Sequence, residues 1–64
     1  MVAIGVDLGA TNLRVGVGDR KGRILEVLRE KTERKSNAAL IKQITRLVTH
    51  FKKNYTVEGI GIAT

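Results

Sequence analysis

The chain of 64 residues has no cysteine and no tryptophan, and only one phenylalanine and one tyrosine. Without cysteine it can form neither a disulfide nor a thiolate zinc site. Two aromatic residues are too few for a stacking platform that binds single-stranded nucleic acid. No apolar run approaches the roughly 20 residues that span a bilayer, and no basic segment with an apolar signal core follows Met1. We therefore expect a cytoplasmic protein with no membrane partner.

Acidic residues are few: six Asp and Glu stand against twelve Lys and Arg, a formal net charge of +6. Such an excess attracts nucleic acid, anionic lipid or phosphate ligands. The basic residues are scattered over a turn, a strand, a loop and a helix, so we expect a solvated basic surface and no specific nucleic-acid partner. A chain of this length forms at most one small domain whose stability is marginal.

Alternation of apolar and small residues predicts two strands close together at the start of the chain. Along the first, Val2, Ile4, Val6 and Leu8 share one face, and Ala3, Gly5, Asp7 and Gly9 share the other. We expect strands over about 2–8, 13–18, 23–32 and 57–64, the first three forming an antiparallel meander. The turn between the second and third has Asp19 to cap its own backbone and Gly22 for a positive φ.

Apolar residues at spacings of three and four predict a helix over about 38–54. Ser36 and Asn37 are both suitable N-caps. The stripe expected to face the sheet is Leu40, Ile41, Ile44, Leu47, Val48, Phe51 and Tyr55, and the residues expected to face away are Lys42, Gln43, Arg46, Thr49, Lys52 and Lys53. A helix between the meander and a last strand predicts an α/β unit with a parallel strand and a right-handed crossover. One helix covers only one face of such a sheet.

Residues Asp7 to Arg14 are the candidates for chemistry. Asp7 ends an apolar strand, where it either binds magnesium, through water, or caps the following turn. Gly9 and Ala10 let the backbone approach a ligand closely, and the amides of Ala10 to Asn12 with the Thr11 hydroxyl suit phosphate oxygens, although an ordinary hairpin turn would use the same residue types. Arg14 either leans toward phosphate or is the polar member of a half-exposed strand. His50, the only histidine, is expected to be solvated.

Other phosphate-binding patterns are absent. No Gly-Lys-Ser or Gly-Lys-Thr occurs, which excludes a Walker loop. Gly16-Val17-Gly18 and Gly59-Ile60-Gly61 each lack the third glycine of a dinucleotide motif.

The segment from Ile4 to Arg14 resembles the first phosphate motif of sugar kinases with an actin-like ATPase fold. It looks most like the glucokinases of the repressor/open-reading-frame/kinase (ROK) family. Asp19 to Leu25 and Gly59 to Ala63 are similar to the family's second turn and fourth strand. Ala10 departs from the family, which more often has a second glycine there.

The resemblance implies an incomplete ribonuclease H-like (actin-like ATPase) domain, of which residues 1–64 are the N-terminal part. It also implies ATP as phosphate donor, Mg²⁺ at Asp7, a hexose as acceptor, and phosphate contacts from Gly9, Ala10, Thr11, Asn12 and Arg14. The catalytic base, the sugar contacts and the family's zinc site would lie beyond Thr64, so no residue here is catalytic.

We therefore expect the N-terminal phosphate- and magnesium-binding segment of an ATP-dependent sugar kinase. On its own it should be inactive, and it should self-associate through its last strand or its uncovered sheet face. The alternative is a non-catalytic actin-like ATPase or interaction module. A catalytic aspartate with sugar contacts downstream would decide for the kinase.

Overall fold

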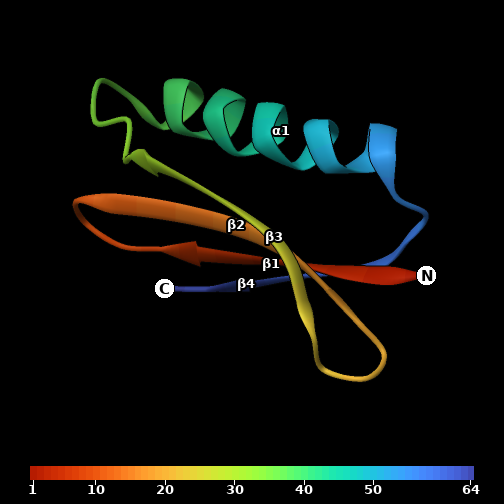
Figure 1. Ribbon diagram of the computed structural model, residues 1–64. Coiled ribbons are helices and arrows are strands. Elements are labelled where there is room, and N and C mark those ends of the chain that lie inside the picture. The colour runs from red at the N-terminus through yellow and green to blue at the C-terminus, as the bar shows by residue number, and fades with distance from the viewer.

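The computed structural model describes all of residues 1–64 as one mixed four-stranded sheet with one helix packed on it (Figure 1). The elements along the chain are β1 (Val2–Leu8), β2 (Asn12–Asp19), β3 (Ile24–Lys31), α1 (Asn37–Asn54) and β4 (Val57–Ala63). Each boundary lies within one residue of the range expected from the sequence pattern.

The strand order in the sheet is β3-β2-β1-β4. The pairs β1–β2 and β2–β3 are antiparallel, whereas β4 returns after α1 to lie parallel to β1. This confirms the expected meander, helix and parallel strand. It also makes β1 and β2 the central strands, and β3 and β4 the two edges.

The turn between β2 and β3 is held by Asp19. Its Oδ1 accepts hydrogen bonds from the backbone N–H groups of Lys21 at 2.9 Å and Arg23 at 3.0 Å. These bonds, led by the one from the Arg23 backbone, lower the pKa of the Asp19 carboxyl below its ordinary value. Gly22 has a φ of 81°, a conformation that glycine adopts without steric cost. Both predictions for this turn are confirmed.

Ser36 is the N-cap of α1, and its hydroxyl accepts a hydrogen bond from the Ala39 N–H at 3.1 Å. Of the two candidate caps, Ser36 is therefore the one used. Lys52 and Lys53 occupy the last turn, where positive charge complements the helix dipole.

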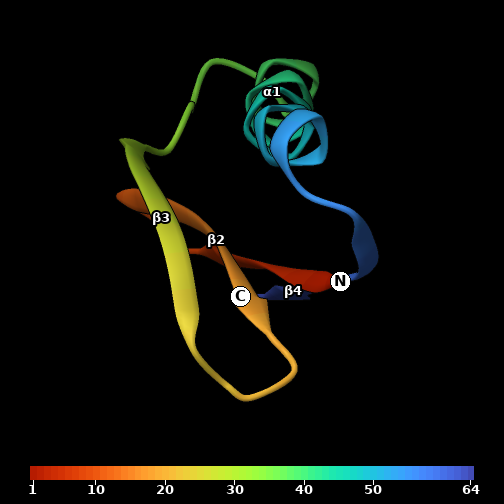
Figure 2. The same ribbon diagram turned by 45° about the vertical axis from the view of Figure 1, so that its right-hand side comes forward.

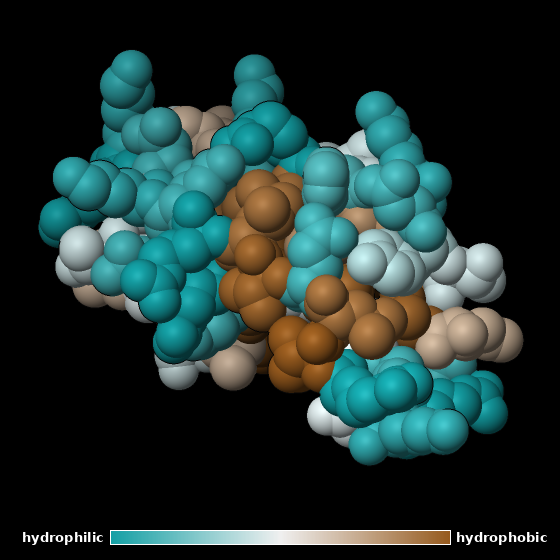
Figure 3. Space-filling model, in the orientation of Figure 1, coloured by the Kyte–Doolittle hydropathy of each residue, from teal (hydrophilic) through white to brown (hydrophobic).

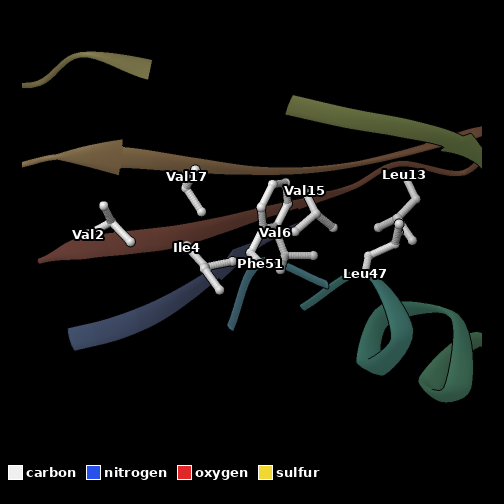
Figure 4. Packing of buried hydrophobic residues seen from close by; sticks show 8 residues of the cluster. All are labelled: Val2, Ile4, Val6, Leu13, Val15, Val17, Leu47 and Phe51. Atoms are coloured by element: carbon white, nitrogen blue, oxygen red, sulfur yellow. The ribbon is translucent and has the colours of Figure 1, made fainter. Parts of the chain in front are cut away.

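The core lies between α1 and one face of β1 and β2 (Figure 4). Leu47 and Phe51 of α1 are buried, as is the face of the hairpin that they contact; the eight buried residues are Val2, Ile4, Val6, Leu13, Val15, Val17, Leu47 and Phe51. None is polar. The alternation predicted for β1 and β2 thus sets which residues face the helix.

Two expectations about the helix surface are wrong. Ile41 is 63% exposed, and Gln43 is half-buried against β3. At 3.6 residues per turn, Ile41 lies about 100° around the axis from the midline between Leu47 and Phe51, and Gln43 about 60° on the opposite side. The buried stripe is therefore narrower than the apolar pattern suggests, and one flank of the helix leans toward β3.

Polar contacts on that flank connect α1 to β3 and the loop after it. The Gln43 side chain donates to the Lys31 carbonyl at 2.8 Å and accepts from the Glu33 N–H at 2.9 Å. Arg46 donates two hydrogen bonds to the Glu30 carboxylate, and the Gln43 amide donates a third. The Arg46 guanidinium first, and then Gln43, lower the pKa of Glu30 below its ordinary value.

The other face of the sheet carries no helix, as Figure 2 shows with α1 on one side only. We call it the open face. Small residues of three strands pair across it: Gly5 lies between Gly16 of β2 and Gly61 of β4. A broad concavity of about 810 Å³ lies over these residues. The expectation that one helix covers only one face is confirmed.

Apolar side chains are also exposed along the edge strands. Ile24 and Val27 of β3 are 70% and 51% exposed, and Ile60 and Ile62 of β4 are 51% and 62% exposed. Figure 3 shows hydrophobic surface gathered in the middle of one side, between the hydrophilic surfaces above and below it.

Helix α1, the single helix of the chain, lacks the apolar length that a membrane span needs.

Candidate functional site

The connection between β1 and β2 is a tight loop made of Gly9, Ala10 and Thr11. The Gly9 N–H donates to the Asn12 carbonyl at 3.0 Å and closes the loop. A Cβ at position 9 would lie 3.1 Å from that same carbonyl oxygen, closer than side chains normally approach. Glycine is therefore favoured here, because a side chain at this position would have to displace the Asn12 carbonyl slightly.

Thr32, just beyond the end of β3, fastens this loop from outside. Its hydroxyl donates to the Gly9 carbonyl at 2.8 Å, and its N–H donates to the Thr11 carbonyl at 2.9 Å. The Gly9 and Thr11 carbonyls therefore each accept a hydrogen bond from within the protein. Sequence reasoning missed Thr32 because it lies 23 residues from Gly9 and carries no local signal.

Several hydrogen-bond donors of the loop have no partner in the protein. The backbone N–H groups of Ala10 and Thr11, the Thr11 hydroxyl and the Asn12 side-chain amide make no hydrogen bond to any other residue. With both carbonyls occupied by Thr32 and these donors free, the loop is a donor-rich concavity of the kind that suits an anion.

These residues line an open recess of about 410 Å³, which we call the β1–β2 recess. Its lining consists of Asp7, Gly9, Ala10, Thr11, Asn12, Arg14 and Arg29. The structure thus brings together every candidate site residue named from the sequence. It adds Arg29 of β3, to which no sequence motif pointed.

Asp7 and Arg14 face each other across the β1–β2 pair and form an ion pair. An Arg14 guanidinium nitrogen lies 2.6 Å from Asp7 Oδ2, with the two side chains 51% and 53% exposed. Such exposed pairs contribute about 0–1 kcal/mol. Arg14 can therefore exchange this partner for another anion at low cost.

The residues of the recess fit a magnesium ion that is bound mainly by substrate phosphate oxygens and by water. Asp7 supplies the only carboxylate that lines it, and no group of three His, Cys, Asp or Glu side chains gathers anywhere in the structure. Magnesium keeps several waters and is commonly bound through one or two carboxylates plus substrate phosphates. One carboxylate beside free donors matches that mode of binding and does not match an all-protein metal cage.

His50 lies on α1, away from the recess. Its side chain is 48% exposed, and its Nε2 lies 3.4 Å from a carboxylate oxygen of Glu26. The sheet separates α1 from the recess side of Asp7 and Arg14, so His50 has no part in this site.

A comparison with protein-family models matches residues 3–64 to the ROK family. The chain belongs to the ROK family. The resemblance of residues 4–14 to the family's phosphate motif is therefore confirmed, and the family match extends over nearly the whole chain. No match was found among curated proteins.

Solved structures agree with this ROK membership. A ROK family glucokinase from Streptomyces griseus, in complex with glucose and AMPPNP, is 32% identical with a TM-score of 0.86. A protein from Cytophaga hutchinsonii, assigned as a candidate sugar kinase, is 25% identical with a TM-score of 0.81. Each alignment covers 98% of this chain but only 20% and 22% of the other chain.

The fold is thus the N-terminal part of an actin-like ATPase kinase domain, as expected from the sequence. The chain spans about a fifth of the length of the two structures that it matches.

Proposed function

We propose that this chain is the N-terminal phosphate- and magnesium-binding segment of an ATP-dependent, glucokinase-like sugar kinase. The complete kinase, meaning the protein that contains this segment, would transfer the terminal phosphate of ATP to a hexose hydroxyl. The observation that carries the proposal is the β1–β2 recess, where free donors, one carboxylate and Arg14 surround an open space. The Streptomyces griseus relative, bound to glucose and an ATP analogue, supports the substrate class.

Four residues that line the recess, and Thr32 beside it, have defined tasks in this proposal. The amides of Ala10 and Thr11 and the Thr11 hydroxyl donate to phosphate oxygens, because none has a partner in the protein. Thr32 donates to the Gly9 and Thr11 carbonyls, so these two acceptors of the loop are already hydrogen-bonded within the protein. Arg14 would leave Asp7 for a phosphate oxygen, and the freed Asp7 carboxylate would be the residue that holds magnesium, through water. Magnesium, when bound, neutralises phosphate charge and aligns the phosphates.

Phosphoryl transfer also needs a base that accepts the proton of the attacking hydroxyl. The only carboxylate in the recess is Asp7, which the proposal assigns to the metal. We therefore propose that the base and the sugar contacts belong to the rest of the complete kinase. The 64-residue chain alone should not phosphorylate glucose, and measurable turnover by this chain would contradict the assignment.

Thr11→Val tests the phosphate contact in the complete kinase. The change preserves shape and removes one donor to a charged oxygen, so it should weaken nucleotide binding or transition-state stabilisation by about 1–3 kcal/mol. Affinity for AMPPNP by calorimetry and steady-state turnover are the measurements. Thr49→Val makes the same change on the exposed surface of α1 and should alter neither. Equal behaviour of the two variants would make residues 9–12 an ordinary hairpin turn.

The isolated chain should self-associate. Strand β4 is an edge strand with one unpaired side, its Ile60 and Ile62 are more than half exposed, and the open face is uncovered. Unpaired edges recruit further strands, and apolar surface of this kind favours association. Sedimentation over a wide concentration range should show oligomers, which would follow from the missing remainder of the domain and would say nothing of the complete kinase.

A pair of isoleucine substitutions locates the contact. Ile62→Lys places a charge on the edge strand and should shift the chain toward monomer, whereas Ile41→Lys alters an equally exposed isoleucine on α1 and should not. A wild-type chain that remains monomeric at high concentration would refute the edge-strand argument.

A further inference from the structure

Arg29 of β3 is the third charged residue that lines the β1–β2 recess, besides Asp7 and Arg14. In the sheet register it lies directly opposite Arg14 of β2, which in turn lies opposite Asp7 of β1. The three side chains belong to the same face of three neighbouring strands, and all three line the recess. They form a row that crosses the sheet beside the loop of residues 9–11.

The charges in this row do not balance. Asp7 is paired with Arg14 at 2.6 Å, while the Arg29 guanidinium makes no ion pair and no hydrogen bond within the protein. Every other residue lining the recess is uncharged. Two guanidiniums therefore accompany one carboxylate, which leaves one positive charge without a partner at the edge of the donor-rich loop.

The direct opposition of Arg14 and Arg29 is also unfavourable in the free protein. Like charges facing each other across neighbouring strands destabilise the pairing. The repulsion is relieved if an anion accepts hydrogen bonds from both side chains. Guanidinium groups suit phosphate in particular, because their planar donors match two phosphate oxygens at once.

We propose that Arg29 is a polyphosphate-binding residue that acts together with Arg14. In the free protein Arg14 forms an ion pair with Asp7. When a polyphosphate binds, Arg14 and Arg29 contact it from the β2–β3 side of the recess, and the loop amides contact it from the other side. The contact between Arg29 and the polyphosphate thereby offsets the loss of the ion pair between Arg14 and Asp7. This inference rests on the proposed function and adds a residue to its phosphate site.

Affinity for inorganic pyrophosphate in the presence of magnesium, measured by calorimetry on the complete kinase, tests the proposal. Arg29→Gln should weaken binding by about tenfold, because a hydrogen bond to a charged group is lost. Arg29→Lys retains the positive charge but lacks the planar pair of guanidinium donors, so its affinity for pyrophosphate should lie between those of the wild type and Arg29→Gln. Lys21→Gln removes the same charge from the exposed turn between β2 and β3, at the other end of the hairpin, and should leave affinity within about twofold at physiological salt.

Thermal unfolding supplies a second readout that does not depend on activity. Without pyrophosphate, Arg29→Gln should be at least as stable as the wild type, since the repulsion with Arg14 is removed. With saturating pyrophosphate the wild type should gain more stability than the variant. A loss of stability in the ligand-free variant would assign Arg29 a structural role and would contradict the proposal.

The possible failures are distinguishable. If Thr11→Val and Arg14→Gln weaken pyrophosphate binding while Arg29→Gln behaves like Lys21→Gln, the role of Arg29 is refuted and the phosphate site remains. If the wild-type protein binds neither pyrophosphate nor AMPPNP, the proposed function and the role of Arg29 are both refuted.

Discussion

Phe51→Ala is expected to unfold the 64-residue chain almost completely at room temperature. Phe51 of α1 is fully buried, is the largest side chain of the core, and packs against the face of β1 and β2. Removing a buried phenylalanine costs about 3–5 kcal/mol. A hydrophobic core in a domain of this size rarely supplies more than about 3–5 kcal/mol in total. The loss is therefore as large as the stability itself.

Urea unfolding followed by circular dichroism measures this effect. Ile41→Ala is the matched control, because it truncates an apolar side chain of the same helix that is 63% exposed, and it should change stability by no more than about 0.5 kcal/mol. Phe51→Leu keeps most of the volume and should retain a cooperative transition. A Phe51→Ala chain that unfolds cooperatively with a loss below about 1 kcal/mol would show that the core is not centred on this residue.

Asp7→Asn in the complete kinase should lower turnover on the order of 100-fold, the size typical for loss of one group that stabilises transition-state charge. Asparagine keeps the shape of the side chain but removes the negative charge that would orient magnesium. Because the change also frees Arg14 from its ion pair, affinity for the nucleotide should fall far less than the rate. The magnesium concentration needed for half-maximal turnover should rise.

Asp19→Asn provides the control for this experiment. It makes the same chemical change in the turn between β2 and β3, where the carboxylate bonds only its own turn. Some stability should be lost there, with no effect on turnover or magnesium dependence. A folded Asp7→Asn kinase with unchanged turnover and magnesium dependence would leave Asp7 as a residue that merely pairs with Arg14.

The central hairpin and its loop could be predicted from the sequence because their signals are local. Alternation along residues 2–8 and 13–18 decides which side chains point to the helix, and the buried residues of β1 and β2 follow it. Asp19 and Gly22 likewise specify a turn through contacts within a few residues. The candidate site residues came together because all six lie on one continuous stretch of chain, from Asp7 to Arg14, around that hairpin.

The remaining features depend on register and on packing between distant segments. Arg29 reaches the recess because β3 pairs with β2 so that it faces Arg14, and Thr32 reaches the loop through the same alignment. No local pattern specifies that alignment. The rotation of α1 is also a tertiary outcome: its contacts with Glu30 and Lys31 draw Gln43 toward β3 and leave Ile41 in solvent.

The most direct test of the account is a map of where a magnesium–nucleotide complex binds. In a ¹⁵N-labelled complete kinase, titration with Mg²⁺ and AMPPNP should shift the backbone amide signals of Gly9, Ala10, Thr11 and Asn12 most among those of this segment. The amides of α1 on the opposite face of the sheet should change little. Saturable shifts confined to the loop would support the β1–β2 recess as the phosphate site. Nucleotide binding that leaves these four amides unshifted would contradict it.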